Sequence, residues 1–386
     1  PNVSVLDEYY WLNKEDPNYS LCRATDQCGH KLPTGHDFTL DKEAQAQLLK
    51  LFLTPEKELE YKKISDCFDE HFWHSNFWLY WQTMFAFQEW SSALEMKRYL
   101  QRFVHHIDGL PDFTALRFTR YNQYESMILP LLHYLEKRGV SFIPHSEVTN
   151  VIVKEGPNGK KRAQSIEVIV SGEKKTIALG LDDYVFVTNG SCVDSTCYGS
   201  QNKAPDLSLL QSGRGDSFDL WKAMARQVKD HSFGRPDAFC SNIEETNWMS
   251  ATIDVDETLI PYITKITQRD PRTGKVCTGG IVTVKDSWDC WRCSWTINRQ
   301  GQFEDQPKDR VLVWFYSLYT NRPGNYIKKP MRECTGVEVA EEWMYHIGVP
   351  TDKIEEYAKK HANTTTAFMP YIDAFFQPRS GTDRPL

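Results

Sequence analysis

Apolar side chains recur at helical spacing in several parts of the chain. The clearest pattern covers residues 91–106, where apolar residues stand three and four positions apart and predict an amphipathic helix. Tyr99 is three positions after Met96 and four before Phe103, so we expect it on the buried side of that helix. Similar spacing predicts further helices over residues 41–53, 56–70, 125–138, 217–228 and 338–346.

Shorter apolar stretches bounded by turn residues predict β-strands. Residues 184–188 are predicted to form an apolar, buried strand, and Pro157-Asn158-Gly159 predicts a turn between two other strands. Those other strands are predicted over residues 140–143, 147–153, 165–170, 280–285 and 311–319. Because helices and strands interleave, the predicted fold class is α/β, with a helix-rich insertion.

The chain is rich in aromatic residues, with 12 Trp, 18 Tyr and 20 Phe. Nine of them fall within residues 72–90. A helix that is apolar nearly all round is either buried in protein or faces a hydrophobic ligand. Both alternatives stay open at this point: large side chains that fill a core, and an aromatic-lined cavity or channel.

Length and charge restrict the kind of protein. At 386 residues, two or three packed units are expected. The net charge of −7 argues against a nucleic-acid partner, because such proteins carry a basic excess or stripe. No run of about 18 apolar residues occurs, so no membrane-spanning helix is expected.

Common catalytic and metal-binding motifs are missing from the sequence, among them GxGxxG, GxxxxGK[ST], HExxH and GxSxG. Cys290 and Cys293 form a CxxC pair without a second pair, so we expect no metal site, and buried free thiols for the ten cysteines. The chain opens without a signal-peptide pattern, which favours a cytoplasmic location. Adjacent residues of a helix face different ways, so His105 and His106 favour surface or structural roles.

Several long blocks are specific enough to indicate a family. They include SNFWLYWQTMFAF (75–87), EMKRYLQRFVHHIDGLPDF (95–113), YNQYESM (121–127), VTNGS (187–191), LYTNRPGNY (318–326) and EWMYHIGVP (342–350). Together they resemble the oleate hydratases, FAD-dependent fatty acid hydratases once called myosin-cross-reactive antigens. The resemblance covers essentially the whole chain. It implies addition of water across an isolated cis double bond of a long-chain unsaturated free fatty acid, without net redox chemistry.

The resemblance also implies roles for individual residues. Tyr99 matches the family's proton donor, and its environment must assist it because a phenol with a pKa of about 10 is a poor acid in water. Gln123, Thr296 and Asn298 match the neutral donors that hold the fatty-acid carboxylate. A fourth family contact is a histidine, but this chain has Gln302 there, which can donate a hydrogen bond only as a neutral group.

For the cofactor, the resemblance implies FAD. The positions that it assigns to flavin binding are Val148, Thr188, Asn189, Gly190 and Ser191. It further implies an incomplete FAD/NAD(P)-binding Rossmann-like domain with a helix-rich substrate-binding insertion and a mixed sheet. The implied division is 1–40 and 136–200 for the FAD-binding domain, 41–135 for a helical substrate-binding region, and 201–386 for a mixed α/β substrate-binding region.

The chain resembles the central part of a hydratase. The family's dinucleotide fingerprint and the glutamate thought to activate water lie before the region that this chain matches, and C-terminal helices linked with membrane association follow it. We therefore expect the isolated chain to bind FAD poorly and to be inactive. Peripheral membrane contact of the full-length protein and a homodimer are further expectations.

Two other functional classes compete with hydration. One is a flavin-dependent oxidoreductase of the amine oxidase-like class, which the mass of the product would distinguish, since hydration adds one water and consumes neither O2 nor hydride. The other is a non-catalytic fatty-acid-binding module, in which changing Tyr99 would leave ligand binding unaffected and no hydroxy product would form.

Overall fold

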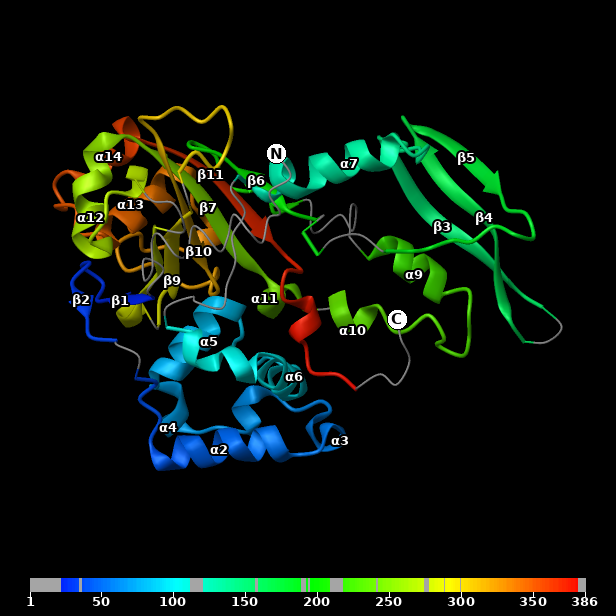
Figure 1. The fold of residues 1–386 in the computed structure, drawn as a ribbon, viewed down its shortest axis with the longest axis horizontal. Helices are drawn as coiled ribbons and strands as arrows, with labels where there is room; N and C mark the ends of the chain where they lie inside the picture. The colour runs from blue at the N-terminus through cyan, green and yellow to red at the C-terminus, as the bar shows by residue number, and fades with distance from the viewer. Residues whose placement is uncertain are drawn as a thin grey trace.

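The computed structural model describes residues 22–34, 37–111, 121–156, 159–188, 192–193, 195–208, 218–240, 242–273, 278–287, 289–298 and 300–380. It contains a large sheet with helices packed on it, a helical region below that sheet, and a small separate sheet at the far end of the molecule (Figure 1). Among the described residues, no helix combines the length and apolar character that crossing a bilayer requires.

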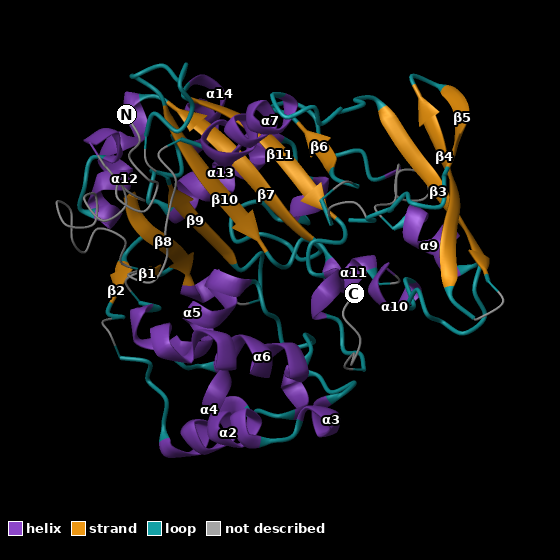
Figure 2. Ribbon diagram, turned by 45° about the vertical axis from the view of Figure 1, so that its right-hand side comes forward, coloured by secondary structure: helices purple, strands orange, loops and turns teal. Residues whose placement is uncertain are grey.

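An eight-stranded mixed sheet forms the centre of the fold (Figure 2). Its β1 and β8 run parallel, and the other neighbouring strands pair antiparallel. In spatial order the strands are β2 (Lys31–Leu32), β1 (Arg23–Thr25), β8 (Thr278–Val284), β9 (Cys293–Ile297), β10 (Val311–Ser317), β7 (Trp248–Val255), β11 (Ala362–Met369) and β6 (Cys197–Gly199).

The two faces of this sheet differ, because successive side chains of a strand point to opposite sides. In β10, Val311, Val313 and Phe315 enter the main hydrophobic core, which helices packed against the sheet complete. The alternate residues Trp314 and Tyr316 lie on the second face. Helices α12 (Ile260–Thr267), α13 (Gly336–His346) and α14 (Ile354–Lys360) pack on strands of the sheet, and α10 (Asp237–Cys240) and α11 (Ile243–Thr246) precede β7 in the chain.

A buried ion pair within α13 ties three distant segments together. Glu342 and His346 are both fully buried, with Glu342 Oε1 3.1 Å from His346 Nε2. The Glu342 carboxylate accepts hydrogen bonds from the backbone N–H groups of residues 325, 326 and 327 at 2.6–2.9 Å. The other ring nitrogen of His346 lies 2.8 Å from the carbonyl oxygen of Gln27, in the β1–β2 turn. Since both ring nitrogens face acceptors, His346 is held as the imidazolium.

The helical region precedes most of the sheet in the chain. It comprises α2 (Lys42–Leu53), α3 (Glu56–Leu59), α4 (Glu70–Trp73), α5 (Asn76–Phe85) and α6 (Ala93–Phe103). Side-chain caps begin α2, α4, α5 and α6: Asp41, for example, accepts from the N–H of Ala44, and Ser92 from that of Glu95. Helix α5 is buried over residues 76–83, so its all-round apolar pattern reflects a position inside the protein.

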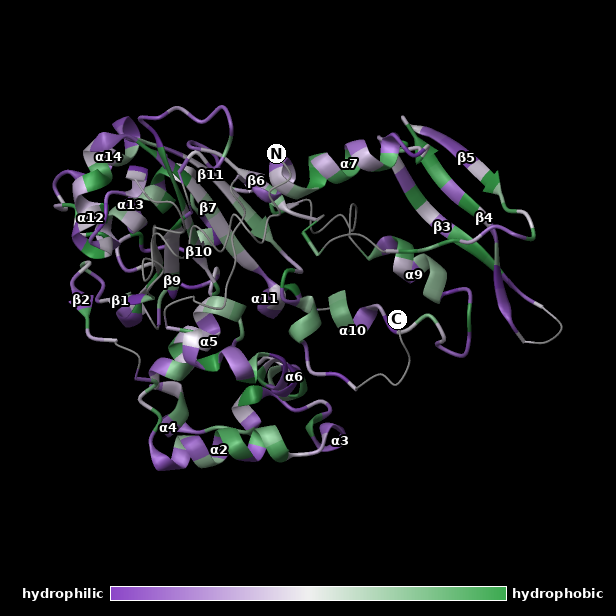
Figure 3. Cartoon of the chain, viewed as in Figure 1, coloured by the Kyte–Doolittle hydropathy of each residue, from purple (hydrophilic) through white to green (hydrophobic). Residues whose placement is uncertain are grey.

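The small sheet lies away from the main one and has the order β3 (Ser146–Glu155), β4 (Lys161–Val170), β5 (Glu173–Ala178). Hydrophobic and hydrophilic residues alternate along β3 and β4 (Figure 3). Helix α9 (Asp219–Ala225) packs on β3, and the Gln227 side chain donates to the Val151 carbonyl at 2.8 Å. Helix α7 (Leu129–Glu136) follows a π-helical turn over Tyr124–Ile128.

Most predicted elements are confirmed, and the fold is mixed α/β as expected. The helices predicted over 41–53, 91–106, 125–138, 217–228 and 338–346 correspond to α2, α6, α7, α9 and α13. The strands predicted over 147–153, 165–170, 280–285 and 311–319 correspond to β3, β4, β8 and β10. Two residues of the predicted turn at 157–159 lie outside the described residues, and Gly159 has the positive φ of +72° that a tight turn requires.

The helix predicted over 56–70 is broken. It divides into α3, a short 3₁₀ turn over Ile64–Asp66, and α4. Backbone hydrogen bonds explain the break: the N–H of Ile64 donates to the Ser91 carbonyl, and that of Ser65 to the Glu89 carbonyl. These tertiary bonds take the amides that a continuous helix would have used.

The strands predicted over 140–143 and 184–188 are wrong. Both segments are irregular, and neither pairs with any described strand. Most of their apolar side chains are exposed, with Tyr184 and Phe186 at 86% and 87%. An apolar run indicates a tendency to be buried, but a strand also needs a hydrogen-bonded neighbour at its edge, and the described residues supply none here.

Candidate functional site

Tyr99 lies on α6 inside a wall of aromatic rings. Its ring centroid is 5.7 Å from that of Phe85, 5.1 Å from Phe87, 6.0 Å from Phe103 and 5.7 Å from Phe376. The first two contacts are edge-on, a favourable geometry for aromatic pairs. The side chain is half-buried, which confirms the prediction that Tyr99 faces the packed side of its helix.

The surroundings of Tyr99 keep its proton in place. Burial raises the pKa of the phenol, and the charges of Glu95 and Asp373 raise it further, while Arg102 lowers it. Tyr99 is therefore neutral at physiological pH and has a proton to give. Since a raised pKa also makes the phenol a weaker acid, proton transfer from Tyr99 requires an acceptor held in a fixed position.

Three of the four predicted carboxylate-binding residues lie in two neighbouring segments, which form a cluster of amides. Asn298 and Gln302 lie in the hairpin between β9 and β10. The Gln302 carbonyl accepts from the Asn122 backbone N–H at 2.8 Å and from its side-chain amide at 3.2 Å. Gln123 follows directly in the chain and is exposed at the start of the π-helical turn. The structure thus brings the segment of Gln123 against that of Gln302.

The residues that hold this hairpin in shape were missed by sequence reasoning. Gln300 donates to the Asn298 carbonyl at 2.6 Å, and Gln306 donates to Gln300 Oε1 at 2.9 Å. Gln306 Oε1 in turn accepts from the Gln302 N–H at 3.0 Å. The signal was present as closely spaced glutamines in the stretch QGQFEDQ (300–306), but nothing in the spacing alone distinguishes a shaped loop from a solvated one.

Thr296 connects this cluster to the second face of the main sheet. It is buried in β9 and pairs directly with Trp314 of β10. Trp314 contacts Tyr316 at 4.7 Å, and Trp248 of β7 contacts both rings. At the other end of β10, the Tyr316 hydroxyl donates to the Thr83 carbonyl of α5 at 2.7 Å. Aromatic rings on this face therefore extend from Trp314, the strand neighbour of Thr296, to Tyr316, which bonds to α5. Phe85 of α5 in turn contacts Tyr99.

The structure does not bring Tyr99 next to the amide cluster. The hairpin that carries Asn298 and Gln302 lies at the start of β10, whereas α5 and α6 lie at its other end (Figures 1 and 2). The seven residues of β10 correspond to roughly 20 Å at about 3.3 Å per residue. The amide cluster and the Tyr99 hydroxyl thus lie at opposite ends of an apolar surface. Such a surface suits an elongated ligand whose one polar end binds the amides and whose apolar chain lies along the aromatic rings.

The predicted flavin-binding residues are open to solvent. Val148 is 37% exposed on β3, and Thr188 is exposed at the end of the irregular segment 181–188. Asn189, Gly190 and Ser191 lie outside the described residues. The two described positions do not by themselves enclose a flavin, so they do not amount to a cradle for the cofactor.

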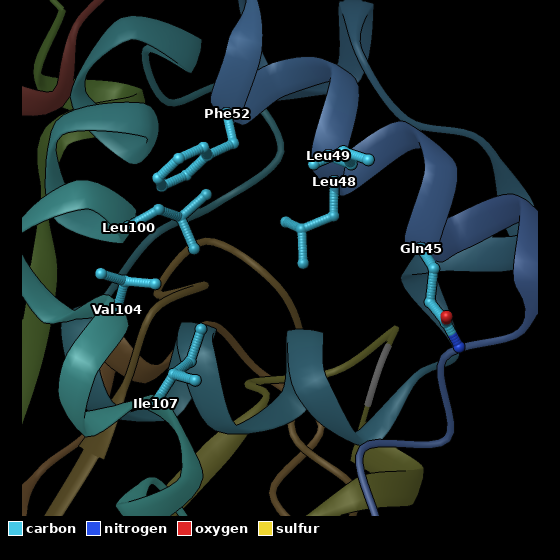
Figure 4. A pocket seen from close by; sticks show the side chains of 7 residues that line it. All are labelled: Gln45, Leu48, Leu49, Phe52, Leu100, Val104 and Ile107. Atoms are coloured by element: carbon cyan, nitrogen blue, oxygen red, sulfur yellow. The ribbon is translucent and has the colours of Figure 1, made fainter.

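An open apolar groove of about 330 Å³ lies between α2 and α6 (Figure 4). Its lining residues are Gln45, Leu48, Leu49, Phe52, Leu100, Val104 and Ile107. Tyr99 does not line it, because neighbouring positions on a helix point in different directions. The groove is thus a separate apolar surface beside the aromatic wall of Tyr99.

The remaining residues singled out in the sequence are two cysteines and two histidines. Cys290 and Cys293 are free thiols, the first half-buried and the second buried. Throughout the described part of the chain, no three His, Cys, Asp or Glu side chains gather as metal ligands. His105 and His106 are exposed, as expected for surface residues.

Sequence comparisons show which known proteins this chain is similar to. The sequence profile of the MCRA family matches residues 1–386. The chain is 45% identical over 388 residues to the oleate hydratase of Streptococcus pyogenes serotype M49 (strain NZ131), covering all of this chain and 64% of the relative. It is 31% identical over 403 residues to the linoleate hydratase of Lactiplantibacillus plantarum, covering all of this chain and 70% of the relative. The chain thus spans about two-thirds of the length of these relatives.

Proposed function

The chain belongs to the MCRA family, and from this premise we propose that it carries the substrate site of a fatty acid hydratase. The substrate is a long-chain unsaturated free fatty acid, of the oleate or linoleate type that the names of the two relatives state. The observation that carries the proposal is the aromatic face of the main sheet, with an amide cluster at one end and Tyr99 at the other.

Tyr99 serves as the proton donor in this proposal. An isolated double bond is a feeble base, so the proton must be delivered from a fixed position while water attacks the neighbouring carbon. The aromatic rings around Tyr99 exclude bulk water and hold the phenol in place. One C–H bond and one C–O bond form, and the product is a hydroxy fatty acid.

The amide cluster binds the carboxylate and sets how far along the sheet the double bond lies. Gln123, Thr296 and Asn298 supply neutral donors, and Gln302 joins them in place of a cationic histidine. Because none of these donors titrates near neutral pH, carboxylate binding itself should depend little on pH between about 5 and 8.

We include FAD as the cofactor of the full-length protein, with Val148 and Thr188–Ser191 on its binding surface. When bound, the flavin supplies structural support and charge stabilisation without net redox turnover. The proposal also includes a Rossmann-like FAD-binding domain formed by residues 1–40 and 136–200. A cytoplasmic location, peripheral membrane contact and a homodimer of the full-length protein are further parts of the proposal.

The test is to incubate the full-length protein with oleate or linoleate and to determine the mass of the product. We expect a gain of one water and no consumption of O2 or reduced nicotinamide. A product that has lost or gained hydrogen alone would instead favour a flavin-dependent oxidoreductase.

A non-catalytic fatty-acid-binding module is the second candidate, and the groove between α2 and α6 favours it, since an apolar groove can hold an acyl chain without any chemistry (Figure 4). Binding of fatty acid without a hydroxy product in the full-length protein would support this candidate.

Replacing Asn298 or Gln123 with alanine is expected to weaken fatty-acid binding about tenfold or more, because a hydrogen bond to a charged group contributes about 1.5–3 kcal/mol. The hydration position should also become less uniform, since the chain can slide along the sheet. Binding is measured by titration and regiospecificity by mass spectrometry of the product. Asn363→Ala, at an exposed position of β11, is the matched control. Unchanged affinity and regiospecificity in both variants would contradict the assignment.

A further inference from the structure

Asp373 is a buried carboxyl group without a role in the hydration steps proposed above. It is only 2% exposed, and its Oδ2 makes no hydrogen bond with any described residue. It forms no salt bridge within the described part of the chain either. Its backbone is held in place, because its N–H donates to the Thr246 carbonyl at 3.0 Å. A buried carboxyl group with an oxygen that lacks a hydrogen-bond partner costs stability, above all when the group is ionised.

The segment of Asp373 packs directly against the site of Tyr99. Three residues further on, the Phe376 ring contacts both Tyr99 and Phe87, with centroids 5.7 and 4.0 Å apart. The Phe376 carbonyl accepts from the N–H of Ser92, the cap of α6, at 2.6 Å. In Figure 1 this red segment lies beside α6, and Asp373 in its ionised form would raise the pKa of Tyr99. The two groups are therefore close enough to interact electrostatically, and protonation of Asp373 removes this effect.

The groups around Asp373 favour its neutral form. Burial raises its pKa well above the ordinary value, and an interaction with the Gln88 side chain only partly opposes this. The charged residues on the neighbouring elements have other partners: Glu95 binds Arg98 at 3.2 Å and Arg379 at 3.0 Å. Glu89 is likewise paired, with Arg292 at 2.9 Å. Asp373 therefore holds a proton close to a tyrosine that must give one away.

We propose that Asp373 is a positioning residue for Tyr99, which holds a proton and returns it to the phenolate after Tyr99 has protonated the substrate. This inference rests on the proposed hydratase function. Once the Tyr99 proton has formed the new C–H bond, the Asp373 O–H proton moves to the phenolate oxygen, directly or through a water molecule. The proton released by the attacking water then restores the Asp373 carboxyl. The balance is one alkene and one water in, and one alcohol out.

Energetics favour this direction of transfer. A carboxylic acid is ordinarily a stronger acid than a phenol, and burial raises the pKa of both groups, so transfer from Asp373 to the phenolate follows the ordinary order of acidity. An ionised Asp373 would have the opposite effect, since a second negative charge nearby would disfavour the phenolate. The neutral state of Asp373 is therefore the one that assists Tyr99.

The test replaces Asp373 with asparagine in the full-length protein. Asparagine is neutral and of similar shape, so folding and fatty-acid binding should persist, whereas kcat should fall about 100-fold, the lower range for loss of a proton-transfer group. In the wild type, activity should fall on the alkaline side as Asp373 ionises, and this limb of the pH profile should be absent in Asp373→Asn. An unchanged kcat and pH profile would overturn the inference.

Two further measurements separate this inference from the proposed function. Asp256→Asn removes a half-buried carboxylate that binds His361 at 2.8 Å, at the other end of β7, and should leave hydration unchanged. The infrared band of a protonated carboxylic acid at neutral pH should be present in the wild type and absent in Asp373→Asn. Its absence from the wild type overturns the inference whether or not the protein turns over. A wild type that hydrates no fatty acid overturns the proposed function itself.

Discussion

Tyr99→Phe in the full-length protein is expected to lower the rate of hydration about 100- to 10 000-fold, the range associated with loss of a positioned general acid. Fatty-acid binding should be nearly unchanged, because phenylalanine keeps the ring that packs among Phe85, Phe87 and Phe376. The rate is measured as hydroxy product over time, and binding by titration with the fatty acid.

The control for this variant is Tyr198→Phe, which removes a hydroxyl from a 70% exposed residue on β6 and should leave the rate unaltered. Equal rates in Tyr99→Phe and the wild type would remove Tyr99 from the mechanism. Full binding with no product in the wild type itself would instead support a fatty-acid-binding module.

Glu342→Ala is expected to destabilise the chain by about 3–5 kcal/mol, the cost of leaving one partner of a buried ion pair alone. The variant strands the imidazolium of His346 and leaves three backbone N–H groups of the 325–327 loop without their acceptor. The free energy of unfolding in denaturant gives the measurement. Glu355→Ala, which breaks an exposed pair with Lys359, should change stability little. A Glu342→Ala protein as stable as this control would refute the role of the pair.

The same pair makes stability depend on pH. Burial raises the pKa of Glu342, but its bonds with His346 and the loop N–H groups outweigh this and lower it. Burial lowers the pKa of His346, but Cys293 and Glu342 outweigh it and raise it well above the ordinary value. The contribution of Glu342 is therefore lost as the pH falls below the ordinary value of about 4.3, and that of His346 as the pH rises above about 6.5. Stability from this pair should be greatest between these values, and the loss at acid pH that comes from Glu342 should vanish in Glu342→Leu.

Local patterns were sufficient for much of the fold. Helix α6 follows from apolar residues at helical spacing, and β3 and β4 from alternation around a turn, because these features depend on residues near one another in the chain. Some signals were present but missed. Trp248–Val255 alternates buried and less buried residues, yet β7 was not predicted. The short β1 and β2 have too few residues to show any period.

Tertiary structure decided the rest, because burial and pairing depend on segments far apart in the chain. Residues 184–188 are as apolar as a buried strand but find no partner among the described residues, and they stay exposed. Glu342 and His346 show a four-residue spacing in the sequence, but only the contacts with residues 325–327 and Gln27 make them a buried ion pair.

The candidate site likewise depends partly on the sequence and partly on the tertiary structure. The sequence by itself determined the family blocks, the aromatic stretch 72–90 and the position of Tyr99 on the packed side of α6. Only the tertiary structure placed the amide cluster and Tyr99 at opposite ends of one sheet face, and only it packed Phe376, in the segment of Asp373, against Tyr99. The sequence around a single loop aspartate does not show that the residue is buried. Segments far apart in the chain exclude water from Asp373, and this burial raises its pKa.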